Sequence, residues 1–106
     1  TDTVAADYDG AVDQLRAQYL ATRLNTMTTP PRLPLGDLYV YDISSIKVEG
    51  ISASAYFGYS TGKLTDIINT IEGKADGNTL LDIFNPPPSR PEMLSMKTVC
   101  DYLNNL

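Results

Sequence analysis

The residues that decide the fold are 35–59, which read LGDLYVYDISSIKVEGISASAYFGY. β-branched and aromatic side chains recur at every second position in this stretch, a period that is typical of strands. The pattern is interrupted at Ser44 and Ser45, where we expect a turn, and at Gly50, where we expect a bulge or bend before a third strand. Two glycines bracket small polar residues in 58–62, which indicates a loop. The stretch therefore predicts a small antiparallel sheet of two or three strands.

One long helix is predicted before the sheet, from Thr3 to about Met27. Apolar side chains recur there at steps of three and four residues and form one stripe, made by Val4, Tyr8, Ala11, Val12, Leu15, Tyr19, Leu24 and Met27. Gly10 interrupts the helix and weakens it by about 1 kcal/mol relative to alanine. The proline-rich residues 26–36 then end it, because proline lacks an amide donor and pushes the residue before it toward extended geometry.

Further helices are predicted after the sheet. Residues 64–73 and 79–84 indicate two short helices, because their apolar side chains would line one face or need burial. Ser89, followed three residues later by Glu92, matches a capping box. Pro91 suits the first turn of a helix, where its missing donor costs nothing. A C-terminal helix is therefore expected to begin near Ser89.

These elements together predict a single α+β domain over residues 1–106. We expect the long N-terminal helix to pack on the small antiparallel sheet, followed by two short helices and a C-terminal helix. A chain of 106 residues with a 42% apolar share is large enough for one core. The residues predicted to fill that core are Leu15, Ile43, Val48, Ile68, Leu81, Phe84 and Val99.

The composition argues against most catalytic and metal chemistry. The chain has no histidine, which removes the commonest general base and metal ligand. Cys100 is the lone cysteine, and we interpret it as a small apolar residue on a helix face; an intermolecular disulfide and a reactive thiol stay open. Asp37, Asp42 and Glu49 lie in or beside the sheet without forming an acid-rich cluster. We therefore expect a protein that is not an enzyme and that holds no cofactor, no metal and no catalytic residue.

The charge distribution narrows the classes of partner. Thirteen acids and eight bases give a net charge of −5, and the bases are scattered along the chain. Nucleic acid is not an expected partner, because binding phosphates needs a clustered positive surface. No window approaches the roughly 18 apolar residues that span a bilayer, so we expect no transmembrane segment in this chain. The sequence does not indicate a compartment.

Tyrosines are the remaining functional signal. Tyr39, Tyr41 and Tyr56 fall in the predicted sheet region, and tyrosine suits half-buried contact surfaces because its ring is apolar and its tip polar. We predict that these three residues contact a protein partner, most simply a second copy of the chain. The function expected is therefore an interaction or assembly module. The alternative is a small binding protein that encloses an apolar, lipid-like molecule between helices and sheet.

Two partial similarities bear on these alternatives. A helix, a proline-rich connector and the sequence IKVEGI at 46–51 together resemble the opening of tubular lipid-binding proteins. A long helix before a small sheet is similar to the soluble part of a pilin, although the apolar N-terminal segment and the cysteine pair of pilins are missing. Neither similarity extends over the chain, and no residue role is carried over from either.

Overall fold

The computed structural model describes residues 2–36, 39–74 and 89–106, and within 2–9 it describes the course of the helix alone. The elements, in chain order, are α1 (Asp2–Asn25), β1 (Val40–Asp42), β2 (Lys47–Val48), β3 (Ile51–Ser52), α2 (Ala53–Phe57), β4 (Thr61–Lys63), α3 (Leu64–Lys74) and α4 (Arg90–Asn104). This order confirms the α+β class, with a long N-terminal helix, small antiparallel strand pairs, further helices and a C-terminal helix. The helix predicted at 79–84 lies outside the described residues.

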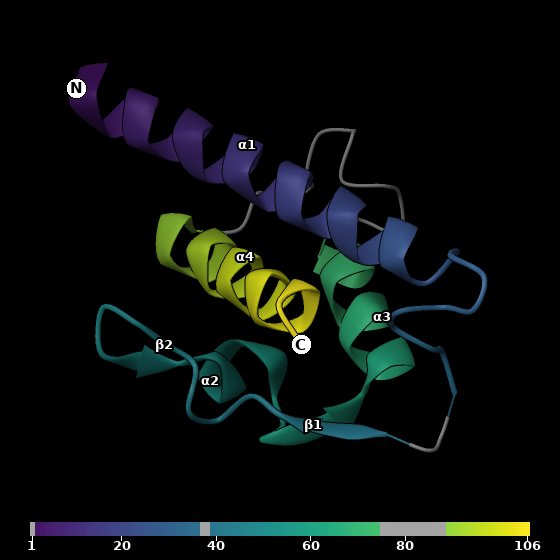
Figure 1. Ribbon diagram of the computed structural model, residues 1–106. Helices are drawn as coiled ribbons and strands as arrows, with labels where there is room; N and C mark the ends of the chain where they lie inside the picture. Colours follow the sequence, from purple (N-terminus) through teal and green to yellow (C-terminus); the bar gives the residue numbers. More distant parts are fainter. Residues whose placement is uncertain (1, 37–38, 75–88) are drawn as a thin grey trace.

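Helix α4 is the central element of the molecule. It lies between α1 on one side and the strand pairs with α2 on the other (Figure 1). The α1 helix packs along α4 more extensively than along any other element, so the long helix meets the strand layer mainly through α4. The buried apolar residues of α4 recur at steps of three and four positions, and they are Met93, Met96, Val99, Cys100 and Leu103. Such spacing on one helix face explains why both neighbours pack on it.

The strands form two separate antiparallel pairs. In the first, β1 pairs with β4, so that Tyr41 lies opposite Gly62. In the second, β2 pairs with β3, and Val48 lies opposite Ile51. Ser44 does form a turn, in which its backbone N–H donates to Asp42 Oδ1 at 2.8 Å. That turn does not fold β1 back onto β2, however, and the predicted loop at 58–62 contains the start of β4.

Residues 53–57 are helical rather than extended. Ser52 caps the helix α2, because its side chain accepts the N–H of Ser54, and Gly58 ends α2 with a positive φ of 83°. The expected strand rested on alternation of alanine with serine and aromatics. None of the residues in α2 is β-branched, and alanine favours a helix. The Ser52 cap and the alanines therefore favour a helix over a strand at 53–57.

At Gly50, where a bulge or bend before a third strand was predicted, the structure has the turn between β2 and β3, and β3 begins at the next residue. Glu49 and Gly50 occupy the two central positions of this turn, with φ values of 54° and 81°. Positive φ at both positions is the type I′ geometry that joins two-residue hairpins. Gly50 adopts this backbone without steric cost, whereas Glu49 does not.

The core gathers side chains from α1, α3, α4 and the segments around the strands. Of the predicted core residues, Leu15, Ile43, Ile68 and Val99 are buried. Val48 is only half-buried, because it lies on a two-residue strand beside an exposed turn. Leu81 and Phe84 lie outside the described residues. No helix in the described part of the chain is both long and apolar enough to cross a membrane.

Helix α4 begins where the sequence predicted it. Ser89 Oγ accepts the backbone N–H of Glu92 at 3.3 Å, and α4 begins at the next residue, as the capping box predicted. The side chain of Glu92 pairs with Lys74 of α3 at 2.8 Å. In α1, the predicted stripe is buried at its middle, but Leu24 is 64% exposed. The end of α1 still contacts α4 through Thr22 and Asn25, and Leu24 lies two positions from Thr22, on the opposite side of the helix.

Candidate functional site

Strand β1 positions two of the predicted site residues. Tyr39 immediately precedes β1, and Tyr41 lies within it, so both side chains point to the same face of the strand. Tyr41 is half-buried and packs against the core. Tyr39 is 56% exposed, and Val40, on the opposite face, is 59% exposed. The strand thus presents apolar surface on both faces.

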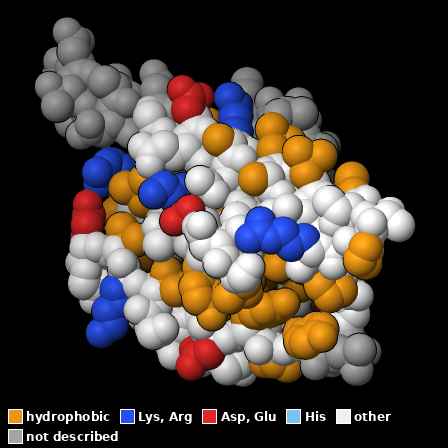
Figure 2. Space-filling view, in the orientation of Figure 1, with side chains coloured by type: hydrophobic (Ala, Val, Ile, Leu, Met, Phe, Trp, Pro, Cys, Tyr) orange, Lys and Arg blue, Asp and Glu red, His pale blue; other side chains and the backbone are white. Residues whose placement is uncertain are grey.

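A third tyrosine joins this pair from the far end of the chain. Tyr102 lies in the last turn of α4 and is 41% exposed. Burial raises the pKa of the Tyr41 phenol, and the neighbouring phenols of Tyr39 and Tyr102 raise it further. We call Tyr39, Val40, Tyr41 and Tyr102 the tyrosine surface. Hydrophobic side chains gather in the lower part of Figure 2, over the region where Figure 1 places β1 and the C-terminal end of α4.

The backbone of β1 leaves one strand edge open. Ile43 N–H donates to the Ser60 carbonyl at 2.8 Å, which extends the β1–β4 ladder by one position. Hydrogen-bonded and non-hydrogen-bonded pairs alternate along an antiparallel ladder, so the polar backbone groups of Tyr41 face β4 and those of Val40 and Asp42 point away from it. Within the described residues, no strand pairs with that outer edge.

Tyr56 lies on a different element from the other two predicted residues. It lies on α2, where it is half-buried and packs against the core. Tyr102 was not identified from the sequence, because no periodic signal connects a C-terminal helix with a strand near the middle of the chain.

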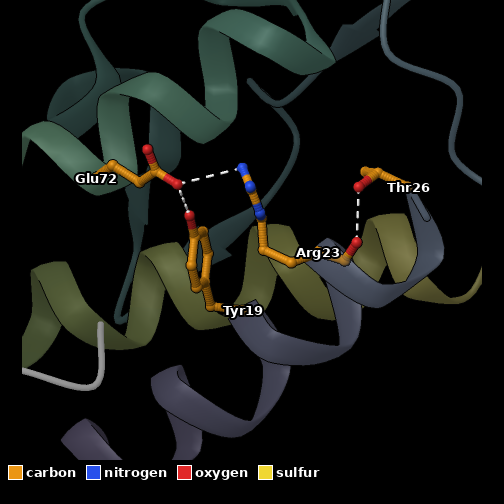
Figure 3. Close-up of polar contacts among 4 residues, drawn as sticks. All are labelled: Tyr19, Arg23, Thr26 and Glu72. Carbon is orange, nitrogen blue, oxygen red and sulfur yellow. Dashed lines mark hydrogen bonds and ion pairs between the residues drawn. The ribbon is translucent and has the colours of Figure 1, made fainter. Parts of the chain in front are cut away.

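A partly buried polar contact joins α1 to α3 (Figure 3). The Tyr19 hydroxyl donates to Glu72 Oε1, and Arg23 Nη1 lies 3.3 Å from the same oxygen. Burial raises the pKa of the Tyr19 phenol far above its usual 10.0, and the hydrogen bond to Glu72 adds to the shift. A phenol that stays protonated at neutral pH, with its proton committed to Glu72, serves to hold two helices together rather than to transfer protons.

A second polar network joins α1 to the end of α4. Asn104 Oδ1 accepts hydrogen bonds from Thr22 Oγ1 and Asn25 Nδ2, both at 3.0 Å. Asn104 Nδ2 donates to the Gln18 carbonyl at 3.1 Å and to Gln18 Oε1 at 2.9 Å. Because each polar atom of the Asn104 side chain has a partner, the network satisfies buried groups and fixes the register of the two helices.

The environment of Cys100 agrees with its interpretation as an apolar residue. Its side chain is buried on α4 between α1 and the core. Burial raises the pKa of the thiol from 9.0 to about 12, and a hydrogen bond with Thr22 opposes the shift. The thiolate is the nucleophilic form, so this cysteine is unreactive at neutral pH. Among the described residues, no group of three or more acidic or cysteine side chains is placed to hold a metal ion.

A cavity of about 400 Å³ lies between β4 and α3. Its wall is made by Tyr59, Thr61, Gly62, Asp66, Asn69 and Thr70. Tyr59 Oη and Thr70 Oγ1 share a hydrogen bond of 2.8 Å across one side, and Asp66 adds an exposed carboxylate. These residues carry hydroxyl, amide and carboxylate groups, but most of the exposed wall is apolar.

Comparisons of the chain with protein-family models, with curated proteins and with solved structures find no match.

Proposed function

We propose that this chain is a non-enzymatic interaction module that binds another protein chain through the tyrosine surface, most simply a second copy of itself. The observation that carries the proposal is the exposure of Tyr39 and Val40 along an open strand edge. Tyr102 continues the apolar surface onto α4. Aromatic residues are enriched at protein interfaces because they remove a large area from water at a small loss of conformational entropy.

The open edge of β1 supports strand pairing as the mode of contact. Exposed edge strands present unpaired N–H and C=O groups, which is the template for adding a strand from another chain. The outward groups of Val40 and Asp42 have the spacing that such a strand requires. An antiparallel pair of identical strands is self-complementary about a two-fold axis, which is the commonest symmetry of protein dimers.

The side chains select among the possible two-fold registers. A pairing centred on Asp42 opposes two like carboxylates, which is unfavourable. Pairings centred on Val40 or Tyr41 instead place tyrosine opposite tyrosine of the second copy, where aromatic cross-strand pairs are stabilising. The proposal therefore assigns the centre of the interface to Val40 or Tyr41. Tyr56, on α2, is retained as a residue at the margin of that contact.

Sedimentation velocity at increasing protein concentration tests this proposal. The wild-type chain is expected to shift from monomer to dimer, and a double change of Tyr39→Ser with Val40→Lys is expected to stay monomeric, because a lysine at the edge opposes strand addition. The matched control is Ile51→Lys, which alters a 42% exposed apolar residue of β3 in the other strand pair. A wild-type protein that stays monomeric up to about 1 mM would contradict self-association.

The alternative function, enclosure of an apolar small molecule, has a separate test. Native mass spectrometry of the purified chain reports a co-purifying molecule directly. The cavity between β4 and α3 has a mostly apolar wall but lies open to solvent and does not enclose a ligand, so it gives this alternative less support than the exposed tyrosine surface gives the first. A stoichiometric lipid-like adduct on a monomeric protein would reverse that preference.

A further inference from the structure

A second cavity, also of about 400 Å³, lies where α1, α4 and β2 meet. It is formed by the N-terminal half of α4, whereas the tyrosine surface includes the C-terminal turn of that helix. The residues around it are Gly10 and Gln14 of α1, Val48 of β2, and Arg90, Leu94, Lys97 and Thr98 of α4. It is therefore a site distinct from the proposed interaction surface.

Two cationic side chains border this cavity in a protein whose net charge is −5. Lys97 is half-buried, and among the described residues no carboxylate forms an ion pair with it. Arg90 Nη1 donates to Glu49 Oε1 at 2.7 Å, which holds the guanidinium beside the cavity. Gln14 adds an amide donor from the opposite wall. The cavity thus collects hydrogen-bond donors and the positive charge of Lys97, whereas the Glu49 carboxylate balances the charge of Arg90.

Gly10 has no packing reason to be glycine. A Cβ built at this position meets nothing within 4 Å, and its backbone is that of an ordinary helix. Glycine inside a helix is less favourable than alanine, because it loses more conformational freedom on folding. Its one structural consequence is to leave the backbone of α1 open at the wall of the cavity. Glycine is the residue that allows a ligand to approach a backbone closely.

Glu49, which contacts the cavity residue Arg90, is a second residue whose backbone conformation is disfavoured for its residue type. It holds a φ of 54° in a turn where asparagine, aspartate or glycine is favoured. The glutamate side chain is long enough to reach Arg90 from this position, and its carboxylate makes the 2.7 Å contact. Residues that break a local rule cluster at functional sites, where the surrounding structure holds them in place.

From these observations we propose that the cavity between α1, α4 and β2 binds a small oxyanion, the phosphate or carboxylate group of a small polar molecule. Lys97 and Arg90 contact the anionic oxygens, and Gln14 donates to a further oxygen. Gly10 lets the ligand lie against α1, and Val48 with Leu94 forms the apolar part of the wall. This site does not depend on the proposed protein interaction.

Nuclear magnetic resonance titration of the ¹⁵N-labelled protein tests the proposal. Inorganic phosphate and acetate are added separately at constant ionic strength, with sodium chloride as the reference salt. Saturable shifts of the Gly10 and Thr98 amides with either anion are expected, and the anion that saturates identifies the oxyanion class. Shifts that do not saturate, or that spread equally over all lysines, would overturn the site.

Two variants separate this site from general electrostatic attraction. Lys97→Gln is expected to weaken the affinity about tenfold, whereas Lys47→Gln, which removes the same charge from an exposed position on β2, is expected to change it less than twofold. Gly10→Ala is expected to raise the melting temperature by a few degrees, because alanine favours a helix and its Cβ would meet nothing. It is also expected to weaken binding, because a side chain then covers the backbone of α1 beside the cavity. Wild-type affinity in both Lys97→Gln and Gly10→Ala would overturn the proposal.

Discussion

At the scale of single residues, Ser89 shows how one side chain starts a helix. Its Oγ accepts the Glu92 N–H, which has no partner inside the helix. Ser89→Ala is expected to lower the free energy of unfolding by about 1 kcal/mol. Thermal or urea unfolding measures this difference, with Ser45→Ala, at an exposed turn position, as the control. An unchanged unfolding free energy would show that the cap contributes nothing.

Alanine substitutions at Gly62 and Gly73 are expected to have different effects on stability. A Cβ on Gly62 would lie 2.7 Å from Cε2 of Tyr59, whose ring is held by the hydrogen bond to Thr70 and by an edge contact with Phe57. Gly62→Ala is therefore expected to destabilise the protein by about 1–3 kcal/mol. Gly73→Ala, where a Cβ meets nothing, is expected to be neutral or stabilising. Equal unfolding free energies for the two variants would contradict the packing of Tyr59 on β4.

The burial of the Tyr19 phenol and the Cys100 thiol predicts that the protein loses stability at alkaline pH. The native pKa values of Tyr19 and Cys100 lie above their ordinary values of 10.0 and 9.0, mainly because of burial. As pH rises, the unfolded chain releases these protons first. Below pH 9.0 both groups contribute fully to the free energy of unfolding. This contribution is lost as the pH rises past the pKa values of the unfolded chain and approaches those of the folded chain.

The Tyr19→Phe variant isolates one of these contributions. Urea unfolding is compared at about pH 8 and about pH 11 in both proteins. We expect the variant to be less stable at the lower pH, because Glu72 loses a hydrogen bond, but to lose less stability on going to the higher pH. An identical loss in the two proteins would mean that Tyr19 is not a source of the pH dependence.

At the scale of elements, the contact between α1 and α4 carries much of the core. Leu15 is fully buried in this contact, whereas Leu24, on the same helix, is 64% exposed. Leu15→Ala is expected to cost about 2–5 kcal/mol through lost burial and a cavity. Leu24→Ala is expected to stay within about 0.5 kcal/mol. Similar losses at both sites, measured by urea unfolding, would mean that the buried face of α1 is assigned wrongly.

Elements with strong local signals were predictable from the sequence. The 3.6-residue period of α1 and the cap of α4 depend on neighbours within one helical turn, so the chain alone reveals them. The third strand expected after Gly50 does begin at Ile51, but it ends at Ser52. The alternation that follows, over 53–57, was wrongly taken for more strand, because it contains no β-branched residue and the Ser52 cap favours a helix. The pairing of β1 with β4 was missed because strands of two or three residues have too short a period to indicate a partner.

The candidate sites were only partly predictable for a related reason. Tyr39 and Tyr41 could be identified because they share one strand face. Tyr102 reaches them only after α4 packs in place, and Lys97 meets Gly10 and Arg90 only once α1 and β2 close the cavity. Contacts between distant segments come from tertiary packing, which no single pattern in the chain encodes.

At the scale of the whole molecule, the described elements place two different surfaces at the two ends of α4. One end has exposed tyrosines and an open strand edge, and the other has a cavity with two cations and donors. Separation along one helix allows both to be occupied at once. The tyrosine surface leaves more apolar area uncovered, because Tyr39, Val40 and Tyr102 are each more than 40% exposed.

Amide hydrogen exchange at low and high protein concentration tests the central claim most directly. If β1 pairs with a second copy, the outward amides of Val40 and Asp42 exchange more slowly as concentration rises. The Tyr41 amide, which faces β4, is protected at both concentrations and serves as the internal control. Exchange at Val40 and Asp42 that is equally fast at both concentrations would contradict an interface formed at the edge of β1.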